Sequence, residues 1–100
     1  MNKSIVAVCE NEACANALIE GGEALGVNIR TEVQNGSSII NELSIEEIKS
    51  SIAVLFVIDG TVEDIEKIER FIDFEYYEVE PKFVINDPKA VINEIVLDIN

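Results

Sequence analysis

The chain alternates four strand-like patterns with four helix-like patterns, and this alternation restricts the possible folds more than any other feature. The strand patterns cover residues 3–9, 27–33, 52–58 and 74–79. Residues 52–58 form an uninterrupted apolar run, which is typical of a central strand buried on both faces. A strand–helix–strand order favours parallel pairing with right-handed crossovers. We therefore predict one α/β domain over residues 1–100, a three-layer α/β/α fold with a four-stranded parallel sheet in the order 2-1-3-4.

Each helical pattern begins at a residue whose side chain can cap it. Asn11 precedes residues 12–25, and Ser44, Thr61 and Asp87 precede the three later helices. The helix after Thr61 is expected because apolar residues recur there at helical spacing, namely Val62, Ile65, Ile68, Phe71 and Ile72. Asn35-Gly36 is a turn signal, and Ser37, Ser38 and Asn41 are expected to continue a polar loop.

Two adjacent glycines lie inside the first helical pattern. Gly21 and Gly22 each cost helix stability relative to alanine, on the order of 1 kcal/mol. Their presence is understandable if this helix has to approach the sheet closely.

The acidic composition excludes several classes of function. Twenty Asp and Glu residues face seven Lys and Arg residues, which gives a net charge of −13. Because a negative field repels phosphate backbones, the chain is not expected to bind nucleic acid or an anionic membrane. The longest apolar run is too short for membrane insertion, and no signal-peptide pattern is present. We expect a soluble, cytoplasmic protein.

The chain contains no histidine, which removes Ser-His and Cys-His nucleophile pairs and histidine metal ligands. Its two cysteines, Cys9 and Cys14, lie five positions apart, which is not the spacing of a zinc site. No metal and no cofactor is therefore expected.

The turn after the first strand is the place where a ligand is expected. Cys9 ends this strand, and Glu10, Asn11 and Glu12 lead into the first helix. Ligands of open α/β sheets bind at the carboxyl ends of the strands, and helix N-termini favour anions. Glu10 and Glu12 would, however, raise the pKa of the Cys9 thiol and repel a phosphate group.

A series of short segments forms an ordered pattern along nearly the whole chain. It comprises residues 5–8, the first helix ending in Leu25-Gly26-Val27, Glu32-Val33-Gln34 with Gly36, residues 41–44, residues 53–59, Arg70-Phe71, residues 76–79 and residues 87–91. This ordered set resembles the fructose-family enzyme IIB domain of the bacterial phosphoenolpyruvate-dependent sugar phosphotransferase system.

The resemblance implies a phosphoryl carrier. A cysteine of such a domain accepts a phosphoryl group from a histidine of enzyme IIA and passes it to a sugar held by the membrane enzyme IIC. The resemblance points to Cys9 as the catalytic residue and to Glu10, Asn11 and Glu12 as the phosphate loop. Gln34, Gly36 and Ser37 would form a secondary loop that could help to hold phosphate. Enzymes IIA and IIC would be the partners.

The first loop differs from the pattern of the family, in which cysteine-proline-threonine-glycine is followed by histidine-threonine. Aligning the helix without a gap puts Glu10-Asn11 at the histidine-threonine and Cys9 one position ahead of the family cysteine. Aligning Cys9 with the family cysteine forces a gap into the helix. Neither alignment supplies the proline-threonine-glycine. Two functions therefore stay open: a working phosphoryl carrier, or a catalytically degenerate relative that serves as a binding or regulatory module.

Asp59, at the end of the third strand pattern, also permits a receiver-domain interpretation. Glu10 and Glu12 would then be metal-binding acids. That fold needs a fifth strand–helix unit and a lysine at a strand end, for which the chain is too short.

Overall fold

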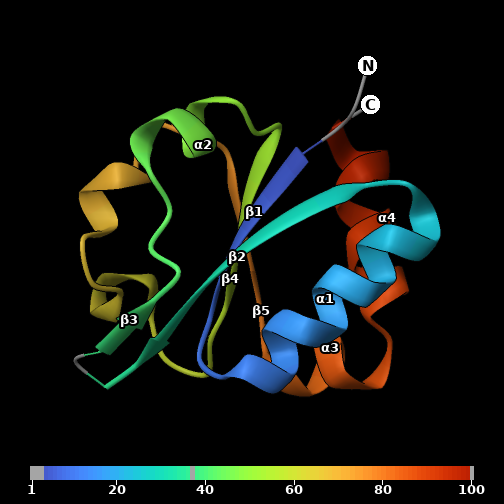
Figure 1. Cartoon of the computed structure of the whole chain (residues 1–100), viewed down its shortest axis with the longest axis horizontal. Helices are drawn as coiled ribbons and strands as arrows, with labels where there is room; N and C mark the ends of the chain where they lie inside the picture. Colours follow the sequence, from blue (N-terminus) through green and yellow to red (C-terminus); the bar gives the residue numbers. More distant parts are fainter. Residues whose placement is uncertain (1–3, 37, 100) are drawn as a thin grey trace.

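Strands and helices alternate along most of the chain, except that β3 follows β2 and α4 follows α3 (Figure 1). A computed structural model describes residues 4–36 and 38–99. The strands are β1 (Ser4–Cys9), β2 (Asn28–Asn35), β3 (Ser38–Ile40), β4 (Ala53–Val57) and β5 (Tyr76–Val79). The helices are α1 (Glu12–Leu25), α2 (Ile45–Lys49), α3 (Pro81–Asn86) and α4 (Pro88–Ile99), and two short 3₁₀ helices, η1 (Val62–Asp64) and η2 (Ile68–Arg70), lie between β4 and β5.

The sheet has five strands in the order β3-β2-β1-β4-β5. The prediction of a four-stranded, wholly parallel sheet is therefore wrong. The four predicted strands are parallel and follow the predicted relative order, but β3 pairs antiparallel with β2 at one edge. The hairpin between them turns at Gly36, whose φ of 64° is one that glycine adopts readily. Because β3 is short and mostly exposed, no buried apolar pattern marks it in the sequence.

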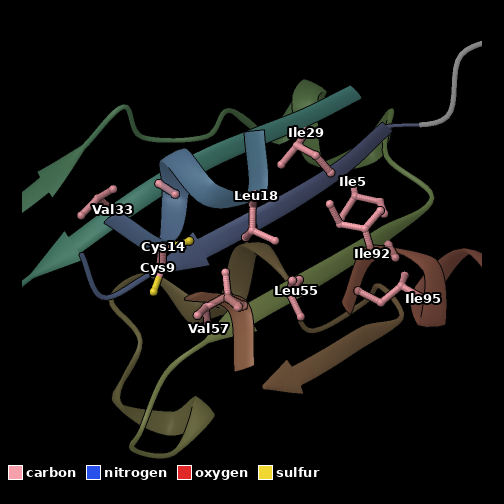
Figure 2. Close-up of a cluster of buried hydrophobic side chains, with 14 residues drawn as sticks. Ile5, Cys9, Cys14, Leu18, Ile29, Val33, Leu55, Val57, Ile92 and Ile95 are labelled. Atoms are coloured by element: carbon pink, nitrogen blue, oxygen red, sulfur yellow. The ribbon is translucent and has the colours of Figure 1, made fainter. Parts of the chain in front are cut away.

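Helices cover both faces of the sheet, so the predicted three layers are present (Figure 1). Ile5, Ala7 and Cys9 of β1 face a cluster closed by α1, α3 and α4, part of which is drawn in Figure 2. Val6 and Val8 face a second cluster closed by α2 and the segment that contains η1 and η2. This alternation follows from the period of two along a strand.

The first helix lies close to the sheet, as its paired glycines suggest. A Cβ atom on Gly22 would lie 2.7 Å from the carbonyl oxygen of Val27 and would also collide with Ile29. Asn11 caps the helix by accepting a hydrogen bond from the backbone N–H of Cys14 at 2.9 Å. The predicted capping box of α2 is also confirmed, with Ser44 and Glu47 bonding each other's backbone.

The single helix predicted after Thr61 is wrong. The chain instead forms η1 and η2, separated by turns in which Lys67 has a left-handed φ of 57°. Of the apolar residues in this segment, Ile65 and Phe71 lie in the second cluster, whereas Ile72 is 63% exposed. A further helix, α3, was not predicted, and Pro81 occupies its first turn.

A buried ion pair holds this irregular segment against β2. Arg70 donates to both carboxylate oxygens of Glu32, at 2.7 and 3.0 Å, and the Glu32 side chain is fully buried. The backbone N–H of Leu43 also donates to Glu32, at 2.8 Å. These contacts fix tertiary structure where backbone hydrogen bonds of a regular helix are lacking.

Within the described part of the chain, no helix has the length and apolar character needed to cross a membrane.

Candidate functional site

A cavity of about 360 Å³ opens at the carboxyl edge of the sheet, where β1, β2 and β4 end. The chain continues from β1 to β2 on one side of this point and from β4 to β5 on the other. Such a reversal of the strand order is the usual position of a ligand site in an α/β sheet. Of the predicted site residues, the cavity brings together Cys9, Glu10, Gln34 and Gly36. Asn11 and Glu12 do not line it, and Ser37 lies outside the described residues.

Cys9 lies at the inner wall of this cavity with a fully buried side chain. Its sulfur points into the apolar cluster beneath α1, together with that of Cys14 (Figure 2). Burial raises the pKa of the Cys9 thiol to about 12, with a smaller contribution from Cys14. The raised pKa agrees with the prediction, but its main cause is desolvation rather than the charges of Glu10 and Glu12. At neutral pH the sulfur is a thiol and not a nucleophilic thiolate.

Cys14 is also a buried, free thiol. Burial raises its pKa, and the charges of Glu10 and Asp59 raise it further, while the hydrogen bond with Asn11 opposes them. Its sulfur lies 3.8 Å from the carbonyl oxygen of Pro81. This weak contact joins α1 to α3, so Cys14 packs between the two helices.

Glu10 closes the loop between β1 and α1 onto the end of β4. Its Oε1 atom accepts a hydrogen bond from the backbone N–H of Asp59 at 2.6 Å. Sequence reasoning assigned Glu10 to the phosphate loop and did not find this contact. The available signal was the parallel order itself, because parallel neighbours bring the residues that follow β1 and β4 to the same edge.

Gln34 is fully engaged by protein groups. Its Nε2 atom donates to Glu32 at 2.7 Å and to the carbonyl oxygen of Glu66 at 3.0 Å, and its Oε1 atom accepts from the backbone N–H of Glu66 at 2.9 Å. Gln34 therefore anchors the segment before η2, and its amide would have to break these bonds to contact a ligand.

The charge around the cavity is unfavourable for a phosphate group. Glu10 and Asp64 line it, and its lining includes no lysine or arginine among the described residues. Arg70 is committed to Glu32 through two hydrogen bonds. No group of three or more potential metal ligands occurs in the part of the chain that the structure describes. An anion bound in this cavity would therefore have to accept hydrogen bonds mainly from backbone N–H groups.

Three solved structures resemble this fold over most of its length. One is a domain of the fructose-specific IIABC component of the phosphotransferase system from Borrelia burgdorferi, at 29% identity, with 94% of this chain and 93% of that chain covered and a TM-score of 0.81. The enzyme IIB subunit from Escherichia coli K12 has 25% identity, coverages of 95% and 92%, and a TM-score of 0.84. A domain of fruA from Bacillus subtilis has 27% identity, coverages of 94% and 91%, and a TM-score of 0.74.

The solved structures that this chain resembles thus include a domain of a fructose-specific phosphotransferase component and an enzyme IIB subunit. The resemblance that the sequence motifs predicted is thereby confirmed. No family model and no curated protein matches the sequence.

The enzyme IIB-like fold also bears on the receiver-domain alternative. That interpretation requires a fifth strand–helix unit. The strand that was not predicted, β3, instead pairs antiparallel with β2 in a hairpin. Asp59 contributes its backbone N–H to Glu10. The assignment of Cys9 as the catalytic residue stays a prediction.

Proposed function

We propose that this chain acts in a sugar phosphotransferase system as an enzyme IIB-like binding module that docks the protein partners of an enzyme IIB domain without carrying the phosphoryl group efficiently. The fold, matched over more than nine tenths of the chain, supports docking. The partners implied are enzyme IIA and the membrane enzyme IIC.

The burial of Cys9 is the observation on which we base the proposed lack of phosphoryl transfer. A phosphoryl acceptor needs a thiolate that a donor histidine can reach, and it needs donors around the phosphoryl oxygens. The Cys9 side chain is 0% exposed and its pKa is raised to about 12. Glu10 also occupies the backbone N–H of Asp59 with a carboxylate, so one possible donor at this edge already has an anionic partner.

An active phosphoryl carrier is the second candidate. The position of Cys9 favours it, because this residue ends β1 at the carboxyl edge beside the cavity. Transfer would require the loop of residues 10–11 to move so that the sulfur faces solvent. Breaking the contact between Glu10 and Asp59 would be part of that movement.

A competition assay tests the proposal. An intact fructose-type enzyme IIB domain is phosphorylated from phosphoenolpyruvate through enzyme I, the histidine phosphocarrier and enzyme IIA, and this chain is added in increasing amounts. We expect inhibition that more enzyme IIA relieves, while this chain gains no label. Absence of inhibition would contradict docking, and labelling of Cys9 at the rate of the intact domain would favour the second candidate.

Two double variants that make the same charge change at different places test where the docking surface lies. Glu10→Lys and Asp64→Lys together reverse the charge at the cavity rim, whereas Glu20→Lys and Glu23→Lys make the same charge change on the exposed face of α1. The first pair should abolish the inhibition, and the second pair should leave most of it. Equal effects from both pairs would show that overall charge, rather than the cavity rim, governs docking.

A further inference from the structure

Strand β5 forms an open edge of the sheet. Among the residues that the structure describes it pairs only with β4, and it is the last strand in the sheet order. The carbonyl oxygen of Glu75 accepts from the backbone N–H of Val54 in β4, and that of Val79 accepts from Ile58, the residue after β4, at 3.1 Å in both cases. In a parallel ladder alternate residues bond to opposite sides, so the N–H and C=O groups of Tyr76 and Glu78 point away from β4. An extended segment could therefore pair with this edge.

An apolar hollow lies on each face of this edge. On the face of α4 lies a hollow of about 320 Å³, here termed the α4-side hollow. Its apolar lining is Leu55, Val79, Val91 and Ile95, and Tyr77 and the carboxylates of Glu78, Glu94 and Asp98 complete it. On the opposite face, Phe56, Val62, Ile68, Phe71, Ile72 and Tyr76 line a hollow of about 220 Å³, here termed the η-side hollow. Figure 2 shows β5 as the strand beyond β4, with Leu55 and Ile95 drawn on the α4 face.

These two hollows match the geometry of an added strand. Successive side chains of a strand point to opposite faces, so an added strand would direct alternate residues into the two hollows. Ile72 is 63% exposed and Tyr76 is 45% exposed at the rim of the η-side hollow. An added strand that covered these two side chains would remove them from water, and this burial would favour binding.

Acidic residues surround the same edge. Residues 72–80 contain Asp73, Glu75, Glu78 and Glu80 and no base, and Glu94 and Asp98 of α4 rim the α4-side hollow. Lys82 on α3 lies 3.8 Å from Glu80, and Arg70, which lies over the ring of Phe71, is paired with Glu32. Two such edges would repel each other, which disfavours a second copy of this chain as the occupant. The charge is complementary to a segment that carries lysine or arginine.

We propose that the β5 edge binds an extended, basic and apolar segment of a partner protein by strand addition, with alternate apolar side chains in the α4-side and η-side hollows. This surface is distinct from the cavity at Cys9, so its partner can differ from enzyme IIA, and the inference does not rest on the proposed function.

Synthetic peptides test the proposal on the full chain. The probe is the capped octapeptide Lys-Lys-Val-Ile-Val-Ile-Lys-Lys, titrated into isotopically labelled protein and followed by backbone amide shifts. We expect saturable shifts at Tyr76 and Glu78, smaller ones at Ile72, and none around Glu10. Replacing the peptide lysines by aspartates, or its two central residues by prolines, should weaken binding at least tenfold.

Charge reversals on the protein provide the matched control. Glu78→Lys with Glu94→Lys acts at the edge, and Glu20→Lys with Glu23→Lys makes the same change on α1. The first pair should weaken peptide binding at least tenfold, and the second by less than threefold. The proposal is overturned if the lysine peptide leaves the β5 amides unmoved, if the proline peptide binds equally well, or if the protein alone dimerises through β5.

Discussion

Oε1 of Glu10 lies 2.6 Å from the backbone nitrogen of Asp59, so a carboxylate of the first loop ties the end of β1 to the end of β4. In an anion-binding loop this N–H would be available to a ligand. Here a side chain of the protein itself already satisfies it, and the Cys9 sulfur lies buried behind it. The first loop is therefore arranged as a closed structural turn.

The tether of Glu10 should be measurable as stability. Glu10→Gln weakens a charge-assisted hydrogen bond in a partly exposed loop, and we expect a loss of about 1 kcal/mol in the free energy of unfolding. Urea denaturation measures it. Glu12→Gln is the matched control, because Glu12 is exposed in the first turn of α1 and should change stability by no more than about 0.5 kcal/mol. Equal losses from both variants would remove the role assigned to the tether.

The buried pair of Arg70 and Glu32 should be far more sensitive. Arg70→Met leaves a fully buried carboxylate without its cation, and the expected loss at pH 7 is about 3–5 kcal/mol. Glu32→Met combined with Arg70→Met should recover part of that loss because no uncompensated charge stays behind. Thermal or urea unfolding of both variants measures the difference. A double variant less stable than Arg70→Met would contradict this explanation.

The same pair predicts a pH dependence. Burial alone would raise the pKa of Glu32, but hydrogen bonds from Arg70, Gln34 and the backbone of Leu43 outweigh it and hold the pKa below its ordinary value. Stability from this group is therefore present above the pKa of an unfolded glutamate, about 4.3, and is lost as the pH falls through the lower folded value.

In Arg70→Met the sign of the pH dependence should reverse. Without the guanidinium, burial favours the protonated carboxyl, so acidification from pH 7 to pH 5 should stabilise this variant relative to the native chain. Unfolding curves at both pH values check it. A constant difference between the two proteins would show that Glu32 does not titrate in the way proposed.

Thiol reactivity should report the burial of Cys9. At pH 8 we expect iodoacetamide to modify Cys9 much more slowly than an unfolded cysteine, because the thiol is buried and its pKa is about 12. Cys14→Ser isolates the signal of Cys9, and the same protein in urea gives the unfolded rate. Modification of the folded protein at the unfolded rate would mean that the loop opens freely.

The close approach of α1 to the sheet can be tested at its glycines. Gly22→Ala places a Cβ 2.7 Å from the carbonyl oxygen of Val27, and we expect a destabilisation of about 1–3 kcal/mol. Gly21→Ala meets its nearest atoms at 3.3 Å, in Pro88 and the flexible end of Ile92, and gains helix propensity. This control should stay within about 1 kcal/mol of the native stability. Urea denaturation compares them, and the reverse order would contradict the packing described.

The sequence predicted the parts of the fold that periodicity and caps determine. The buried strand around residues 52–58, the helix of residues 12–25 with its Asn11 cap, and the capping box of Ser44 and Glu47 all occur. It failed where tertiary contacts override local pattern. The segment after Thr61 has helical spacing, but it does not form one helix. Arg70 donates a hydrogen bond to the buried Glu32, and Lys67 has a positive φ that interrupts the helical backbone.

The candidate site was predicted in position more than in detail. The carboxyl edge after β1 follows from the order of the strands, and it holds a cavity with Cys9 in its wall. The orientation of the Cys9 sulfur depends on which face of β1 the residue occupies, and a strand buried on both faces has no polar alternation to indicate this. The contact between Glu10 and Asp59 joins residues 49 positions apart, so local pattern does not encode it.

Intact mass measurement after exposure to the phosphoryl donors tests the central claim most directly. The chain is incubated with phosphoenolpyruvate, enzyme I, the histidine phosphocarrier and enzyme IIA, beside a variant in which cysteine-proline-threonine-glycine is built between Val8 and Glu12. A buried Cys9 predicts little or no added phosphoryl group on the native chain and a clear gain in the variant. Full labelling of the native chain, lost in Cys9→Ser and kept in Cys14→Ser, would contradict the account.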